Sequence, residues 1–231
     1  MNKKVIIFDL DGTLIDSMKI WHEVDIIFLG KRGIPVSDDI FDDLKTNSIV
    51  DMAIFVKEKF ALAESIEEIM TEWIDETKYY YENTLKLRPG AFDFITYLKQ
   101  NNYTLAVGTS NSLYLAEAVL RQNKIYDYFS TIVAGCSNLK GKPEPDIYLQ
   151  VCENLGCSPE DCLVFEDSLV WVQAAKNAGM MVYAIEDETA AIDKEEIRKL
   201  ADEYFVDYEE ILHLRDSFVN RKLFFTCEIL D

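Results

Sequence analysis

Two acidic residues one position apart, Asp9 and Asp11, are the side chains in this sequence best placed to do chemistry. They follow the apolar run Val5–Phe8 and precede Gly12. Side chains alternate in direction along a strand, so both carboxylates can share a face at its end, and glycine lets the chain turn beside them. Two carboxylates this close repel each other unless a cation lies between them. Oxygen ligands without a nearby histidine favour Mg²⁺ over zinc, although a solvated acidic turn would have the same sequence.

The chain around these acids alternates between strands and helices. Apolar runs indicate strands at residues 4–8, 103–108, 131–134, 162–166, 181–185 and 204–206, and amphipathic segments between the later runs indicate helices. Strands that alternate with helices predict a mostly parallel sheet that is covered on both faces. We therefore expect an α/β fold with a Rossmann-like core.

Residues 16–87 differ from the rest because they have helical periodicity without strand signals. Within them, Ser65 followed by Glu68 has the spacing of a capping box at the start of a helix. This block predicts a helical-bundle cap inserted after the first strand. The expected domains are an α/β catalytic core, residues 1–15 and 88–231, and the cap, residues 16–87.

Polar residues also stand at the ends of later strands, where ligands bind in open α/β sheets. Thr109 offers a hydroxyl to a phosphate oxygen, or it is an ordinary helix N-cap. Lys142 precedes a helix expected at residues 146–155, and prolines fix the first turn of that helix, but a lone surface lysine would read the same way. Glu166 and Asp167 form a second acidic pair at a strand end.

With these residues in view, the chain resembles the haloacid dehalogenase-like superfamily of phosphatases and phosphomutases, in the subgroup with a small helical cap. The resemblance covers about residues 1–212. Four segments match the four motifs of the superfamily: Asp9–Leu14, Thr109, Lys142-Pro143 and Glu166-Asp167.

The resemblance implies a role for each of these residues. Asp9 would be the nucleophile that forms an aspartyl phosphate, and Asp11 would be the general acid and base. Mg²⁺ would be held by the Asp9 carboxylate, the Asp11 backbone carbonyl and Asp167, with Glu166 in or near the next layer of residues. Three residues would bind the transferring phosphoryl group: Thr109, Ser110 and Lys142.

These roles predict a phosphatase that acts on a small phosphorylated metabolite, such as a sugar phosphate. The alternative is a sugar-phosphate mutase resembling β-phosphoglucomutase, whose cap holds a second phosphoryl group with a histidine and an arginine. This chain has Trp21 and Ile49 at those places, with His22 one residue late. It also has Thr13 after Gly12, as phosphatases commonly do. A haloacid dehalogenase would not need Asp11. A binding or regulatory protein on the same fold would not need a complete catalytic set.

Composition limits the remaining possibilities. The chain has 231 residues and a formal net charge of -19, which argues against nucleic acid and anionic membranes as partners. Five cysteines without a C-x-x-C pair indicate neither a disulfide framework nor a zinc site. The first apolar run is too short for a signal peptide, and no apolar run is long enough to span a membrane. We expect a cytoplasmic enzyme that is a monomer or a weak dimer.

Overall fold

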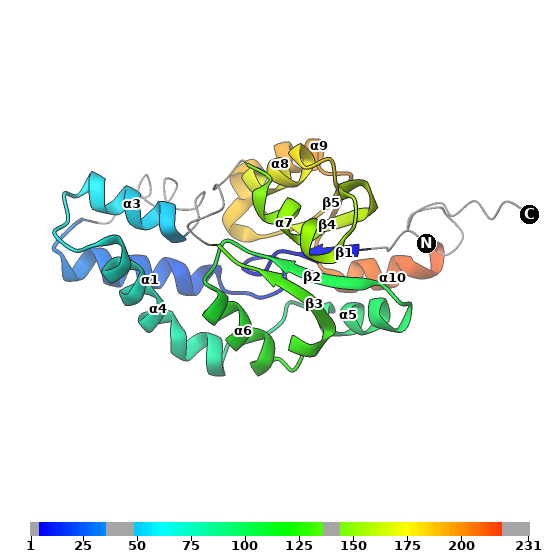
Figure 1. Ribbon diagram of the computed structural model, residues 1–231, viewed down its shortest axis with the longest axis horizontal. Helices are drawn as coiled ribbons and strands as arrows, with labels where there is room; N and C mark the ends of the chain where they lie inside the picture. The colour runs from blue at the N-terminus through cyan, green and yellow to red at the C-terminus, as the bar shows by residue number, and fades with distance from the viewer. Residues whose placement is uncertain (1–4, 36–48, 136–143, 219–231) are drawn as a thin grey trace, which may run out of the picture.

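The computed structural model describes residues 5–35, 49–135 and 144–218. Its centre is a parallel sheet of six strands in the order β3-β2-β1-β4-β5-β6 (Figure 1). The strands are β1 (Val5–Phe8), β2 (Thr104–Gly108), β3 (Phe129–Val133), β4 (Cys162–Glu166), β5 (Met181–Ile185) and β6 (Glu203–Phe205). All six predicted strands are present, and β3 and β6 begin earlier than the apolar runs indicated.

Helices cover both faces of the sheet (Figure 1). One layer contains α5 (Ala91–Gln100), α6 (Leu113–Gln122) and α10 (Tyr208–Phe218), and the other contains α7 (Asp146–Leu155), α8 (Leu169–Asn177) and α9 (Lys194–Leu200). Strand β1 serves both layers, since Ile6 and Phe8 pack into the first core while Val5 and Ile7 pack into the second. The predicted α/β class with a Rossmann-like core is confirmed.

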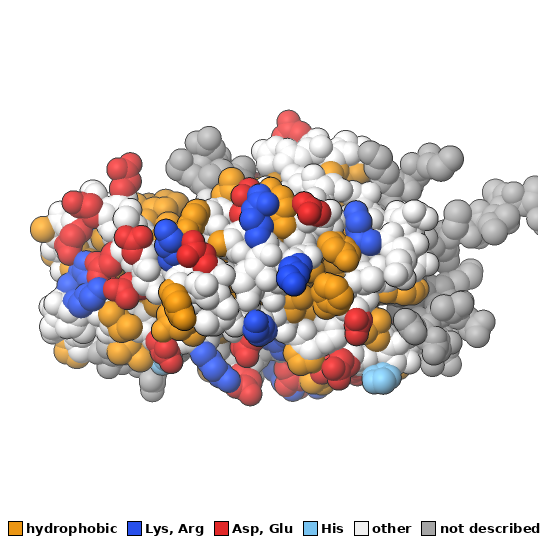
Figure 2. Space-filling model, turned by 90° about the horizontal axis from the view of Figure 1, so that it is seen from below, with side chains coloured by type: hydrophobic (Ala, Val, Ile, Leu, Met, Phe, Trp, Pro, Cys, Tyr) orange, Lys and Arg blue, Asp and Glu red, His pale blue; other side chains and the backbone are white. Residues whose placement is uncertain are grey.

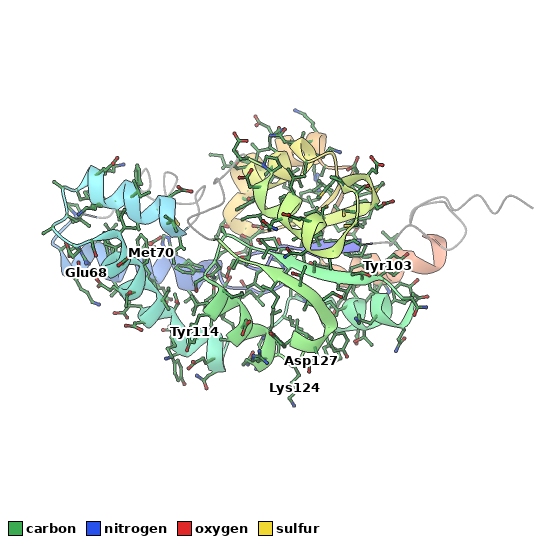
Figure 3. All side chains as sticks on the ribbon, viewed as in Figure 1. Glu68, Met70, Tyr103, Tyr114, Lys124 and Asp127 are labelled. Carbon is green, nitrogen blue, oxygen red and sulfur yellow. The ribbon has the colours of Figure 1, made fainter. Side chains whose placement is uncertain are left out.

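The helices α1 (Met18–Lys31), α3 (Ile49–Lys59) and α4 (Ile66–Asn83) lie beside the sheet rather than over it (Figure 1). They share a separate apolar core that includes Phe28 and Trp73. The predicted capping box begins α4: the Glu68 backbone N–H donates to Ser65 Oγ at 3.2 Å, and the Ser65 N–H donates to Glu68 Oε2 at 2.7 Å (Figure 3 labels Glu68). The division into core and cap at residues 16 and 87 stays a prediction.

Two chain segments join these helices to the sheet, and they pair with each other. The Arg88 N–H donates to the Leu14 carbonyl at 2.9 Å, and an antiparallel bridge links Ile15 to Leu87. A second contact lies farther out, where Tyr114 of α6 faces α4 (Figure 3) and its hydroxyl donates to Glu82. The helical block formed by α1, α3 and α4 is therefore held to the core at two places. One is the pair of connecting segments, and the other is the contact between α4 and α6.

The surface of the described residues is mixed in charge. On the face drawn in Figure 2, Lys and Arg side chains are interspersed among Asp and Glu rather than gathered into a basic stripe. Among the helices that the structure describes, none combines the length and the apolar character needed to cross a membrane.

One buried acid in α1 gives a pH-dependent prediction. Asp25 is buried, and its Oδ1 has no hydrogen-bond partner among the described residues. Burial raises the pKa of Asp25 from 3.8 to about 7. Because this pKa is higher in the folded than in the unfolded state, the free energy of unfolding falls as the pH rises from 3.8 to about 7 and stays reduced above that range. We expect Asp25→Asn to add about 1–3 kcal/mol of unfolding free energy at pH 8 and little at pH 4.

Thermal unfolding at the two pH values measures this effect, and Glu23→Gln is the matched control. Glu23 is an exposed acid on the same helix, so its substitution removes the same charge without the burial. A gain for Asp25→Asn of roughly 2–4 °C per kcal/mol should appear only at the higher pH. An equal shift in Tm at both pH values would contradict the assignment of the effect to Asp25 ionisation.

Candidate active site

Three carboxylates meet at the carboxyl ends of β1 and β4. The two strands pair with Phe8 opposite Phe165, and the Asp9 N–H donates to the Phe165 carbonyl at 3.0 Å. The next residues of each strand are thereby brought together. Carboxylate oxygens of Asp9, Glu166 and Asp167 lie within 4.8 Å of one another, and all three residues are buried.

Neighbouring donors orient two of these carboxylates. The Tyr148 hydroxyl donates to Glu166 Oε1 at 2.6 Å, and the Asp167 N–H donates to Glu166 Oε2 at 3.0 Å. Burial, together with the charge of Glu166, raises the pKa of Tyr148 well above its usual value, so this hydroxyl stays protonated. Thr13 Oγ1 donates to Asp167 Oδ1 at 2.9 Å. The result is a fixed, all-oxygen cluster, which suits a hard divalent cation.

The turn after β1 is shaped to make room for this cluster. Gly12 has a φ of +85°, and a Cβ at this position would lie 2.5 Å from Asp167 Oδ2. Arg88 holds the same turn, since its Nη1 donates to the Gly12 carbonyl at 2.7 Å. That guanidinium also pairs with Asp187 at 2.9 Å and donates to the Glu186 carbonyl. Arg88 therefore ties the end of β5 to the turn that carries the acids.

Asp11 does not point its carboxylate into this cluster but into a set of donors from other elements. Ser17 Oγ donates to Asp11 Oδ1 at 2.6 Å, and the Tyr81 hydroxyl donates to the same oxygen. Asn111 Nδ2 donates to Asp11 Oδ2 at 2.8 Å. Trp21 Nε1 donates to Tyr81 Oη at 2.7 Å and lies 3.4 Å from Asp11 Oδ1. The Asp11 carboxylate is therefore held both by α4 and the start of α1 and by the loop that follows β2.

Sequence reasoning missed most of these donors. Tyr81 lies in the last turns of α4 and gives no local signal. Its burial, and then the negative charge of Asp11, raise the pKa of Tyr81 well above its usual value, so the hydroxyl remains a donor. Asn111 directly follows Thr109 and Ser110, which were predicted to bind phosphate. This position at a strand end was the one sequence signal that could have marked Asn111 as a site residue. Trp21 stands where a mutase has a histidine, and its contact with Asp11 was not predicted.

The predicted phosphate-binding residues fall partly within the described chain. Thr109 is buried at the end of β2, where its N–H donates to the Val133 carbonyl at 2.9 Å and its Oγ1 accepts the Asn111 N–H at 3.1 Å. Thr109 does not cap α6, because Ser112 accepts the Leu115 N–H at that helix start. The helix N-cap alternative for Thr109 is therefore wrong.

Ser110 follows in the same loop and approaches the end of β3 closely. A Cβ on Gly135 would lie 2.3 Å from the Ser110 carbonyl oxygen, so only glycine fits opposite it. Lys142, the third predicted phosphate ligand, lies outside the described residues. The structure thus gathers Asp9, Glu166 and Asp167 into one cluster and places Thr109 at the end of the strand beside β1.

Buried acids at the carboxyl ends of β1 and β4, with helices inserted after β1, form a candidate site at the edge of a parallel sheet where open α/β proteins bind their ligands. A family model described as haloacid dehalogenase-like hydrolase matches residues 3–179. The chain belongs to the haloacid dehalogenase-like hydrolase family. The predicted resemblance is confirmed, and so is the prediction of an enzyme of the phosphoric monoester hydrolase type, to which similar proteins also belong.

Three similar proteins illustrate the range of this family. A phosphorylated carbohydrates phosphatase of Thermotoga maritima is 30% identical over 195 residues, covering 82% of this chain and 90% of its own. A β-phosphoglucomutase of Bacillus subtilis is 31% identical over 190 residues, covering 79% of this chain and 83% of its own. The crystal structure of CbbY from Rhodobacter sphaeroides in complex with phosphate has a TM-score of 0.79 and 25% sequence identity. The match covers 90% of this chain and 96% of CbbY.

Proposed function

We propose that this chain is a Mg²⁺-dependent phosphatase that hydrolyses a small, sugar phosphate-like metabolite through an aspartyl phosphate on Asp9. The observation that carries the proposal is the buried cluster of Asp9, Glu166 and Asp167 at the carboxyl ends of adjacent strands. Three acids in one buried site repel one another and any phosphate dianion. Such a site is useful to a phosphatase only with a cation. Phosphatases of sugar phosphates among the similar proteins support the substrate class.

The residues present fit Mg²⁺ as that cation. The donors are oxygen atoms, which the ion prefers. The Asp9 and Asp167 carboxylates and the Asp11 backbone carbonyl would hold it, with Glu166 orienting the neighbouring groups through its own hydrogen bonds. When bound, the ion supplies positive charge that offsets the acids and the incoming phosphate.

Asp9 and Asp11 would divide the chemistry between them. An Asp9 carboxylate oxygen attacks phosphorus in line, and the bond from phosphorus to the leaving oxygen breaks. Asp11 gives a proton to that oxygen and later takes one from the water that hydrolyses the aspartyl phosphate. The Ser17, Tyr81 and Asn111 side chains donate to the Asp11 carboxylate, which fixes its direction between these steps.

The phosphoryl group itself would be bound by Thr109, Ser110 and Lys142. Thr109 is close enough for this role because β2 pairs directly with β1. Its Oγ1 accepts the Asn111 N–H, so the hydroxyl hydrogen remains available to a phosphate oxygen. The task of these residues is to position the group and offset its charge.

The direct test is phosphate release in the presence and absence of Mg²⁺. A panel of phosphorylated metabolites and p-nitrophenyl phosphate should show turnover that EDTA lowers by at least about 100-fold, because the acids then lack their counter-ion. Excess Mg²⁺ should restore the rate. Inorganic phosphate is measured in both cases, and turnover that survives chelation would contradict the metal assignment.

The mutase alternative is weakened by the residues at two positions of the helical block. Ile49 is buried in the core of this block and carries no charge. Trp21 directs its Nε1 to Tyr81 and Asp11 rather than to a distant anion. Neither position supplies a cation for a second phosphoryl group, and water then competes better for the aspartyl phosphate.

A single assay separates hydrolysis from transfer. With β-glucose 1-phosphate and a trace of the corresponding bisphosphate, the protein should release inorganic phosphate, if this sugar is a substrate, and form little glucose 6-phosphate. Both products are followed in parallel, with a sugar phosphate found active in the panel as the positive control. Glucose 6-phosphate that accumulates faster than phosphate would favour the mutase.

A further inference from the structure

Three cysteines meet at the opposite end of the sheet from the carboxylates. Cys152 lies near the end of α7, Cys157 follows in the turn, and Cys162 begins β4. Cys162 Sγ is 3.6 Å from Cys152 Sγ and 3.7 Å from Cys157 Sγ, and all three sulfur atoms lie within 4.8 Å of one another. Each is a free thiol. One helix end, one turn and one strand start thus converge on a single group of sulfur atoms.

The group is separate from the proposed active site. Strand β4 begins at Cys162 and ends at Glu166, and Asp167 follows it. A strand of that length spans about 13–17 Å, which is too far for the thiols to touch the reacting groups. Cys152 and Cys162 are buried, whereas Cys157 is partly exposed. The exposed edge gives an ion in solution a route to the sulfur atoms.

Two of the three sulfur separations match those of a thiolate metal site, and the third is within 4.8 Å. With a metal–sulfur bond of about 2.3 Å and tetrahedral angles, two ligating sulfur atoms lie about 3.8 Å apart. The observed separations of 3.6 and 3.7 Å need little change to reach this value. Thiolates select soft or borderline cations over Mg²⁺, which prefers the carboxylates at the other end of the sheet. The two sites therefore differ in the ions that they accept.

We propose that Cys152, Cys157 and Cys162 bind one thiophilic d¹⁰ cation of the Zn²⁺ or Cd²⁺ type, with water in the fourth position. On binding, each sulfur atom loses its proton to solvent and forms one bond to the metal. In the free protein the Cys162 thiol donates to the Ser158 carbonyl at 3.5 Å and the Cys157 thiol to the Cys152 carbonyl at 3.9 Å. The metal replaces these weak contacts and joins α7 to β4.

Cd²⁺ is the probe, because its bonds to thiolates absorb in the ultraviolet. The whole chain, reduced with a phosphine and held in excess Mg²⁺ to occupy the carboxylates, is titrated with Cd²⁺. We expect the thiolate-to-metal band to saturate at one equivalent. Cys157→Ser should weaken binding at least about 10-fold and reduce the band. Cys227→Ser, which removes one thiol at a position outside the described residues, is the matched control and should behave as the unaltered protein.

Two further measurements do not depend on the variant. Cd²⁺ at about 100 times its Kd should raise the Tm of the unaltered protein by roughly 5–10 °C. It should also protect Cys152, Cys157 and Cys162 from alkylation, counted by mass spectrometry. A fully reduced protein that gives no thiolate band, binding that is unchanged in Cys157→Ser, or alkylation that Cd²⁺ does not slow would each overturn the proposal.

Discussion

Asp9→Asn should lower turnover by about 10⁴-fold or more while the protein stays folded. A neutral amide cannot form the acyl phosphate, so the first covalent step is lost. The Asp9 backbone N–H still donates to the Phe165 carbonyl, and asparagine has the shape of aspartate. Removing one of three neighbouring acids also relieves repulsion, so the Tm without Mg²⁺ should be unchanged or higher.

Turnover of the best substrate and thermal unfolding should be measured on the same preparation. Asp16→Asn is the control, because Asp16 is exposed and its substitution changes the charge equally. It should keep most of the activity. Near-normal turnover in Asp9→Asn would place the nucleophile elsewhere, whereas a large fall in Tm would make the loss of activity uninformative about chemistry.

The second large effect is expected from Gly12→Ala. A Cβ would lie 2.5 Å from Asp167 Oδ2, and the backbone has a φ of +85°. The methyl group must push Asp167 away from Asp9 and Glu166, and a displacement of about 1 Å in an active site can cost 10²-fold in rate. We expect at least that loss of turnover, with a higher Mg²⁺ concentration needed for half-maximal activity.

Gly179→Ala separates the steric effect from the backbone effect. Gly179 has a φ of +82°, but a Cβ there would meet nothing within 4 Å. Both variants should therefore lose about 1 kcal/mol of unfolding free energy from the left-handed backbone. Only Gly12→Ala should also lose turnover and Mg²⁺ affinity. Equal activity in the two variants would show that the space beside Asp167 is not critical.

The fold could be predicted from the sequence because its elements are strongly patterned. Strand β1 is a short, wholly buried apolar run, and β4 is buried throughout and apolar up to Phe165. Strand β5 and helix α5 begin and end where the pattern indicated. The start of β3 was less clear, because Phe129 and Ser130 are not fully buried and lack an apolar run. Edge positions of a sheet carry a weaker signal for this reason.

The acids of the candidate site could also be predicted, because they directly follow strands and the carboxyl ends of parallel strands share one edge. The donors around Asp11 could not. Tyr81 reaches Asp11 only because α4 packs against α6, and Arg88 reaches Gly12 only because the chain returns beside Leu14. Such contacts depend on how helices pack, which local periodicity does not specify.

The cluster of Cys152, Cys157 and Cys162 could not be predicted from the sequence either. Its three cysteines are evenly spaced, but wider apart than in a C-x-x-C motif. The turn between α7 and β4 folds back on itself, and this brings Cys157 and Cys162 toward the end of the helix. The geometry of that turn, rather than the spacing, places the sulfur atoms together.

The paired connection between sheet and helical block restricts how the two can move. The bridge between Ile15 and Leu87 and the hydrogen bond from the Arg88 N–H to the Leu14 carbonyl join the two connecting segments, so neither can move without the other. If the helical block rotates about this pair of segments, each of its residues moves in proportion to its distance from the pair. Tyr81 is at the end of α4 that leads into the paired segments, whereas Ile69 lies about 18 Å farther along the same helix. A rotation about this pair of segments would therefore displace Asp11 and its partners least and the Ile69 end of α4 most.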